Sequence, residues 1–318
     1  MFYTKIEELN NMGRRMQSRH NRGQKKVKKR YQITTDDIIK QIKHGTPLTK
    51  PMIEILNEES LIKFIKDSIP ISILNQAEMS GKNIVTDIYR LIVGDKKYAH
   101  LRERTIGNLA GLVGHVWANN YFKRKGYEVD NEVVLYDRTT GEKLTSTDIV
   151  LTDSSGRQVF IELKTAFKIG IDGDEVPASN DDKKTKEYFR PGRIIPRASM
   201  QDVRKETIIE STTLTGNKAI RQLKANTKYI IDKEDDIDRR VALCVYKGVE
   251  IYPKAREKIS ELGEIIELPL NIYKLYAYCF NLVGSLVYYG RNLTNPPRGQ
   301  RGRKFEERYD VSRIDLDL

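Results

Sequence analysis

Three charged residues lie in two apolar segments, where a buried strand would normally carry none. Asp148 lies in TDIVLT, and Glu162 and Lys164 lie in VFIELKTA. A Ser-Ser-Gly turn between the two segments predicts an antiparallel hairpin over residues 145–166. Side chains alternate along a strand, so Glu162 and Lys164 point to one face, and strand pairing can bring Asp148 beside Glu162.

This arrangement predicts a site for phosphodiester hydrolysis. Two carboxylates a few ångströms apart repel each other, and burial makes the charged form of each more costly. A divalent cation removes the conflict, and hard oxygen ligands suit Mg²⁺ or Mn²⁺. The ammonium of Lys164 can then position and acidify a metal-bound water or stabilise developing negative charge.

Asp148, followed fourteen residues later by Glu162-Leu163-Lys164, resembles the motif of the PD-(D/E)XK nuclease superfamily. The resemblance implies an α/β (α+β) fold with a restriction-endonuclease-like core, in which helices flank a central mixed β-sheet. It also implies that Asp148, Glu162 and the carbonyl of Leu163 bind the metal and that Lys164 assists the attacking water. Serine and threonine precede Asp148 where the family often has proline, at a position that varies in the family.

Two further segments resemble the family. GHVWANNYFKRKGY, residues 114–127, is similar to a helix that in many members reads G-E-x-x-A-x-x-Y-L-x-x-x-G-Y, with His115 where glutamate is common. His115 either reaches the metal or a phosphate, or is a histidine satisfied by its neighbours on the flank of the helix. Gln222, in NKAIRQLKAN, stands where members often have a glutamine near the active site, and otherwise is an ordinary surface residue.

The secondary structure expected around the motif follows the family's order of helix, three strands, helix and strand. These elements are a helix over 101–126, a strand over 127–137, the hairpin over 145–166, a helix from about 215 and a buried strand over 239–252. The alternative is a charged edge hairpin in which Glu162 and Lys164 form an ion pair. The large apolar neighbours of Glu162 favour a central strand instead.

Five regions are expected along the chain of 318 residues, of which the resemblance covers about 101–246. They are a basic arm (1–32), an N-terminal helical region (33–98), the nuclease core (99–250) with a polar insertion (167–215), a helical and aromatic segment (251–293) and a tail (294–318). The helical region shows no recognisable chemistry. The most apolar window, residues 275–290, is too short for a bilayer span and predicts a core helix, with a dimer surface as the alternative.

The net charge of +12 favours a polyanionic partner, either nucleic acid or an anionic membrane surface. The basic arm and a loop near residue 190 favour nucleic acid, and a solvated basic tail is the alternative. DNA is the default substrate of the superfamily, and RNA stays open. The expected contacts are Arg14, Arg15, Arg19, Arg22, Lys25, Lys26, Lys28, Lys29, Arg30, Arg190 and Arg193.

Other classes of site have no motif in the sequence. Cys244 and Cys279 lie in apolar surroundings without CxxC spacing, which predicts buried, reduced thiols. No HExxH zinc motif and no GxxxxGK[ST] phosphate loop is present. The first residues lack the apolar segment of a signal peptide, so we expect a cytoplasmic protein.

The sequence therefore predicts a Mg²⁺- or Mn²⁺-dependent endonuclease. Two alternatives stay open. One is a non-catalytic nucleic-acid-binding or assembly protein with a nuclease-like fold. The other is a nuclease subunit of a restriction, transposition or phage-defence complex that is active only with a partner. A homodimer is also compatible with the sequence.

Overall fold

The computed structural model describes residues 58–93, 101–137, 139–172, 174, 215–231, 237–294, 316 and 318. The elements are α4 (Glu58–Ser68), α5 (Ile71–Met79), α6 (Ile84–Val93), α7 (Leu101–Arg124), β1 (Glu128–Tyr136), β2 (Lys143–Thr152), β3 (Gln158–Lys164), β4 (Lys168–Ile169), α10 (Thr215–Ile231), β5 (Arg239–Lys247), β6 (Glu250–Ile251), α11 (Pro253–Ser260), β7 (Glu264–Asn271) and α12 (Ile272–Thr294). The predicted helix, three strands, helix and strand correspond to α7, β1, β2, β3, α10 and β5. The short strand β4, which was not predicted, lies between β3 and α10 and pairs with β6 in a second sheet.

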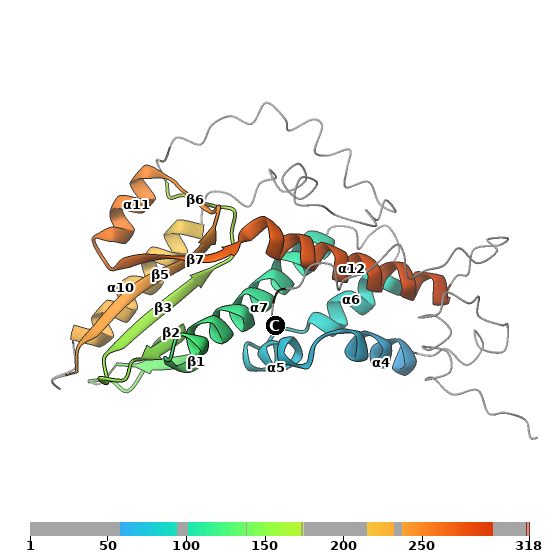
Figure 1. Ribbon diagram of the computed structural model, residues 1–318, viewed down its shortest axis with the longest axis horizontal. Coiled ribbons are helices and arrows are strands. Elements are labelled where there is room, and N and C mark those ends of the chain that lie inside the picture. Colours follow the sequence, from blue (N-terminus) through green and yellow to red (C-terminus); the bar gives the residue numbers. More distant parts are fainter. Residues whose placement is uncertain are drawn as a thin grey trace, which may run out of the picture.

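Five strands form one mixed sheet in the order β1-β2-β3-β5-β7 (Figure 1). The pairs β1–β2 and β2–β3 are antiparallel, and β3–β5 and β5–β7 are parallel. The predicted hairpin is therefore confirmed, and β3 is the central strand of the sheet. The edge position in the alternative is wrong, because β3 has a strand on each side. The pairing of Glu162 with Lys164 that the alternative expected is present.

Helices cover both faces of the sheet. Alternate residues of β5 point to opposite faces and pack against different helices. Cys244 and Tyr246 belong to the core that α7 and α12 share, whereas Leu243 and Val245 pack with apolar residues of α10 and α11. Burial on both faces explains why β5 is a nearly continuous apolar run. The architecture is thus a mixed sheet between two layers of helices, as Figure 1 shows.

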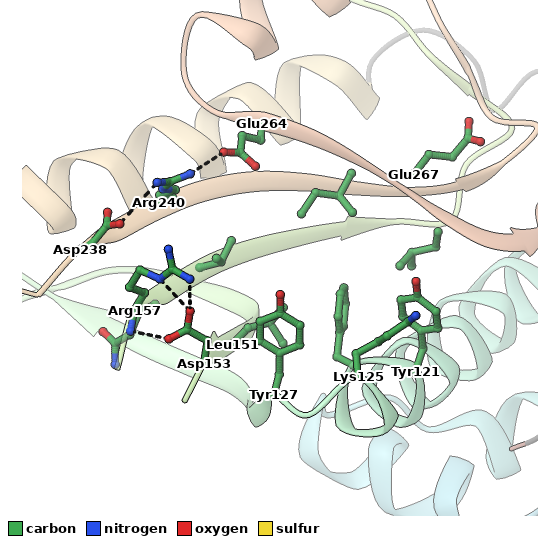
Figure 2. A pocket seen from close by; sticks show the side chains of 15 residues that line it. Tyr121, Lys125, Tyr127, Leu151, Asp153, Arg157, Asp238, Arg240, Glu264 and Glu267 are labelled. Carbon is green, nitrogen blue, oxygen red and sulfur yellow. Dashed lines mark hydrogen bonds and ion pairs between the residues drawn. The ribbon is translucent and has the colours of Figure 1, made fainter. Parts of the chain in front are cut away.

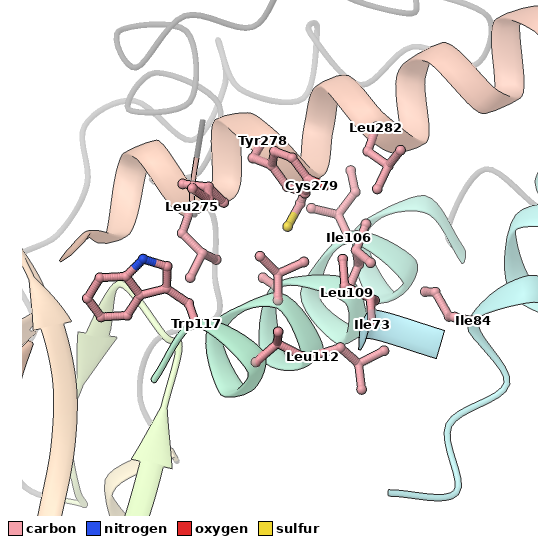
Figure 3. Packing of buried hydrophobic residues seen from close by; sticks show 14 of the residues in the cluster. Ile73, Ile84, Ile106, Leu109, Leu112, Trp117, Leu275, Tyr278, Cys279 and Leu282 are labelled. Atoms are coloured by element: carbon pink, nitrogen blue, oxygen red, sulfur yellow. The ribbon is translucent and has the colours of Figure 1, made fainter. Parts of the chain in front are cut away.

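The N-terminal helices share a core with the sheet. Ile73 of α5 and Ile84 of α6 pack in one cluster with Leu109 of α7 and Leu282 of α12 (Figure 3). Helix α12 lies against α6 and α7, and α5 lies against α7. The described part of the helical region, α4 to α6, is therefore packed against α7 and α12, and α7 in turn contacts β1 and β2.

The long apolar helix α12 belongs to this core, as the sequence predicts for residues 275–290. Both cysteines are buried and free. Within the ranges that the structure describes, no helix is long and apolar enough to span a membrane. The sheet continues beyond residue 250, where the sequence analysis ended the core, because β7 adds a fifth strand.

Helix α7 lies close to the sheet at Gly114. The hydroxyl of Tyr246 on β5 donates a hydrogen bond to the carbonyl of Gly114 at 2.6 Å. A Cβ atom at Gly114 would lie 2.7 Å from Thr165 Cγ2 and 2.9 Å from the Tyr246 hydroxyl. The absence of a side chain at Gly114 therefore sets the position of α7 over the end of β3, where the motif lies.

We expect the change Gly114→Ala to destabilise the protein by roughly 1–3 kcal/mol, because the new methyl group overlaps packed atoms. Alanine is a better helix former than glycine by about 1 kcal/mol, so helix propensity alone would stabilise the variant. The expected loss of stability is therefore due to the steric overlap. The matched control is Gly107→Ala in the same helix, where a Cβ would meet nothing within 4 Å. Urea denaturation should show loss of stability for the first variant and none for the second. Equal behaviour of the two variants would contradict this packing.

Candidate active site

The two acidic residues of the motif lie on neighbouring strands in one register. The β2–β3 pairing runs as far as Ile149 opposite Ile161, which places Asp148 opposite Glu162 at the next position. At this position the Asp148 side chain joins the two strands, because its Oδ2 accepts a hydrogen bond of 2.7 Å from the backbone N–H of Leu163. The backbone of β3 therefore holds one oxygen of the Asp148 carboxylate in place.

A second side chain joins the strands at the same point. Thr147 is fully buried, and its hydroxyl donates to the carbonyl of Ile161 at 2.9 Å. Asn226 of α10 in turn donates to the Thr147 hydroxyl at 3.3 Å. The threonine that stands where the family often has proline thus connects β2 to β3 and, through Asn226, to α10.

The carboxyl group of Glu162 is buried, and one of its oxygens has no hydrogen-bond partner among the described residues. Glu162 is 0% exposed, and its Oε1 pairs with the ammonium of Lys164. Oε2 is also buried, and it has no hydrogen-bond partner among the described residues. Burial raises the pKa of Glu162 to about 7; the ammonium of Lys164 opposes this rise and the charge of Asp148 adds to it. A carboxylate held this way is costly without a further positive partner.

Lys164 lies between the carboxylate and the helix on the same face. Its ammonium contacts Glu162 and donates to Gln222 Oε1 on α10 at 3.2 Å. The lysine side chain is only 12% exposed, so these contacts fix the direction of its ammonium. The structure thus brings Gln222 into the site, and its catalytic role remains a prediction.

His115 lies beside Asp148, and both ring nitrogens already have protein partners. Nδ1 is 3.3 Å from Gln76 Nε2, and Nε2 is 3.1 Å from Asn131 Oδ1. If Nε2 carries the proton and donates to Asn131, Nδ1 accepts from Gln76. Burial lowers the pKa of His115, although the charge of Asp148 opposes this effect. This is the arrangement of a satisfied, neutral histidine, and its role as a metal or phosphate ligand remains a prediction.

A third carboxylate, Glu132 on β1, lies at the site and was not predicted from the sequence. It lies opposite Asp148 in the β1–β2 register and has φ 49°, a conformation that non-glycine residues rarely adopt. Its Oε1 accepts from Gln76 at 3.3 Å and lies 3.7 Å from His115 Nδ1. Burial, followed by the charge of Asp148, raises the pKa of Glu132. The signal in the sequence is the polar Asp-Asn-Glu run in the middle of a strand.

The carboxylates of Asp148 and Glu162 fit a small divalent cation. Mg²⁺ is commonly held by one or two carboxylates, with water and substrate phosphates completing its octahedron. Asp148 Oδ1 makes no hydrogen bond to a described residue, and Glu162 Oε2 is equally free. Within the described ranges, no three His, Cys, Asp or Glu side chains are placed to hold a metal together. The carbonyl of Leu163 as a third ligand remains a prediction.

The remaining predicted contacts lie outside the described residues. These are the arm and loop residues Arg14, Arg15, Arg19, Arg22, Lys25, Lys26, Lys28, Lys29, Arg30, Arg190 and Arg193.

A groove of about 460 Å³ lies elsewhere, by the β2–β3 turn and the first residues of β5 and β7 (Figure 2). Its charges are largely paired with one another: Arg157 contacts Asp153 at 2.7 Å, and Arg240 contacts Asp238 at 3.4 Å and Glu264 at 3.3 Å. Since each arginine already has an acidic partner, this groove is a poor candidate for binding a polyanion.

The site described above therefore consists of two carboxylates with free oxygens, a lysine between a carboxylate and Gln222, and a third carboxylate beside a neutral histidine. Comparisons with protein-family models, with curated proteins and with solved structures returned no match.

Proposed function

We propose that the protein is a metal-dependent nuclease that hydrolyses phosphodiester bonds of nucleic acid, most simply DNA. One observation carries the proposal: Glu162 is a fully buried carboxyl group, in contact with Lys164, and has an unpartnered oxygen. Apolar residues on a central strand would give equal or greater stability than a buried ion pair. The pair is better explained by chemistry that needs it.

The order of elements and the spacing of Asp148, Glu162 and Lys164 support the same proposal, because they agree with the PD-(D/E)XK resemblance. The restriction-endonuclease-like fold is part of the proposal. The shared architecture is a mixed sheet with helices on both faces, and β3 at its centre carries the Glu-Leu-Lys segment.

Bound by Asp148 and Glu162, Mg²⁺ or Mn²⁺ would supply positive charge at the scissile phosphate and lower the pKa of the attacking water. Lys164 has three N–H donors, of which two are directed at Glu162 and Gln222. The third can donate to the attacking water or to a non-bridging phosphate oxygen. The attacking water gives one proton to solvent and its oxygen attacks phosphorus. The bond from phosphorus to the leaving sugar oxygen breaks, and that oxygen takes a proton from solvent.

The protein holds these groups in place before substrate arrives. The Leu163 N–H fixes Asp148, the contact with Gln222 fixes Lys164, and Thr147 keeps β2 and β3 at a constant separation. Such preorganised groups stabilise charge in the transition state without having to reorient during the reaction.

The experiment is a cleavage panel. The wild type and Asp148→Asn are incubated with labelled linear duplex DNA, closed circular DNA, single-stranded DNA and RNA, each with Mg²⁺, Mn²⁺ or EDTA. The control variant is Asp130→Asn, an exposed residue on β1. We expect cleavage by the wild type and the control with metal, none in EDTA and none by Asp148→Asn. Cutting of the closed circle would identify an endonuclease.

Failure of the folded wild type to cleave any polymer would contradict the proposal. Binding without cleavage would then favour the two alternatives, a partner-dependent nuclease subunit or a non-catalytic binding protein.

A further inference from the structure

The turn between α5 and α6 places a lysine at the site. Helix α5 ends at Met79, Gly81 takes the left-handed conformation with φ 64°, and the backbone N–H of Lys82 donates to the Ala77 carbonyl at 2.8 Å. This is a common way of closing a helix, and it gives the chain a fixed direction as it leaves the helix. The position of Lys82 is therefore defined by local hydrogen bonds.

The side chain of Lys82 crosses α7 at a glycine. Its Nζ lies 3.3 Å from the place that a Cβ of Gly111 would occupy, and Thr165 Oγ1 lies 4.0 Å from that same place. Thr165 directly follows Lys164 at the end of β3. The ammonium of Lys82 thus lies over α7, close to the end of the strand that carries the motif.

The electrostatic surroundings of Lys82 are those of the site itself. The protein around the ammonium displaces water and lowers the pKa of Lys82, while the charges of Glu132 and Asp148 oppose that effect. Lys164 and Lys218, the latter an exposed residue of α10, also act on it. Four charged groups, one each from β1, β2, β3 and α10, therefore influence this one ammonium.

Lys82 nevertheless has no ionic partner in the part of the chain that the structure describes. The residue is exposed, and no hydrogen bond or ion pair joins its ammonium to another described residue. Glu132, the acidic group with the larger effect on Lys82, has its Oε1 in contact with Gln76 and His115. An unpaired ammonium beside carboxylates that can hold a divalent cation is well placed to bind an anion.

We propose that Lys82 binds a phosphate group of the nucleic-acid substrate beside the scissile bond. The helical region, through its α5–α6 turn, then forms one wall of the active site. This inference rests on the proposed nuclease function. Once a divalent cation balances the carboxylates, the ammonium groups of Lys82, Lys164 and Lys218 leave the site with net positive charge, which attracts the phosphate backbone.

The test compares Lys82→Ala with Lys82→Arg, which keeps the charge, and with Lys66→Ala, which removes an exposed lysine from α4 of the same helical region. Binding to labelled nucleic acid is measured by fluorescence anisotropy over a range of salt concentrations, with Ca²⁺ in place of Mg²⁺ so that a divalent cation still balances the carboxylates. Single-turnover cleavage is measured with Mg²⁺. We expect Lys82→Ala to lose roughly tenfold in affinity and in cleavage rate, as for one charge-assisted contact.

The slope of log affinity against log salt concentration should also fall by about one for Lys82→Ala, because one phosphate contact is lost. Lys82→Arg should restore most of the affinity, and Lys66→Ala should match the wild type. A merely structural role for Lys82 would change the urea midpoint and leave the salt slope unchanged.

Two results would overturn the inference in distinguishable ways. If the wild type cleaves and Lys82→Ala matches it in affinity, salt slope and rate, the inference about Lys82 fails alone. If the wild type neither binds nor cleaves nucleic acid, the proposed function fails together with it.

Discussion

Replacing Glu162 with glutamine is expected to abolish cleavage and, at about pH 8, to stabilise the metal-free protein by roughly 3 kcal/mol. Glutamine keeps the shape of the side chain but carries no charge, so one ligand for the divalent cation is lost. The same change removes a carboxylate that is 0% exposed and has an unpartnered oxygen. Loss of activity and gain of stability should therefore appear in one variant.

The stabilisation should depend on pH in a defined direction. The pKa of Glu162 is raised from its ordinary value of 4.5 to about 7, chiefly by burial. The folded wild type therefore binds more protons than the unfolded chain between these two values, and its stability falls as pH rises through that interval. The variant lacks this group, so its advantage should be small near pH 5 and reach a plateau above about pH 7.

Urea denaturation at about pH 5 and pH 8 measures this difference. His115 is present in both proteins, so its titration contributes equally and cancels to first order. The control is Glu267→Gln, which changes an exposed glutamate on β7 and should alter stability little at either pH. If Glu162→Gln were less stable than the wild type at the higher pH, the contact with Lys164 would outweigh the cost of burial.

Replacing Lys164 with methionine should lower the single-turnover cleavage rate by about 10³-fold while nucleic-acid binding persists. Methionine fills much the same space without an ammonium, so the donor aimed at the water or the phosphate is lost. Asp148 and Glu162 remain, so the variant should still bind Mn²⁺. Calorimetry at about pH 8 measures this binding. The change at Lys164 should therefore lower the cleavage rate without removing metal binding.

The matched control is Lys247→Met, at an exposed position on the neighbouring strand β5. It should leave cleavage unchanged. A Lys164→Met variant that cleaves at the wild-type rate would show that the ammonium between Glu162 and Gln222 has no part in the reaction.

The centre of the site could be predicted from local sequence patterns. The two apolar segments and the Ser-Ser-Gly turn were enough to predict the hairpin and to expect that pairing could bring Asp148 beside Glu162. The register itself came from the structure. Gln222 and His115 came from the resemblance alone, and the structure shows that one contacts Lys164 and the other lies beside Asp148. These features depend on short stretches of chain.

Glu132, Gln76 and Lys82 could not be predicted, because their surroundings depend on how distant elements pack. Glu132 joins the site through an unusual backbone angle in β1, and Gln76 reaches it from α5. The helical region shows no chemistry in its sequence. Its contribution follows from the core that α5 and α6 share with α7 and α12.

Strand β7 was also missed, for a different reason. Its segment EIIELPLN contains two glutamates and a proline, which are unfavourable within a central strand but tolerated at a sheet edge. As the last strand of the sheet it pairs only with β5 within the described residues. A local pattern of this kind is ambiguous until the neighbouring strand is known.

The most direct test of the central claim is the rate at which the wild type and Glu162→Gln cleave one nucleic-acid substrate in Mg²⁺ and in EDTA. We expect cleavage only by the wild type and only with Mg²⁺, from two proteins that are equally folded. Cleavage by Glu162→Gln at the wild-type rate, or cleavage that persists in EDTA, would contradict it.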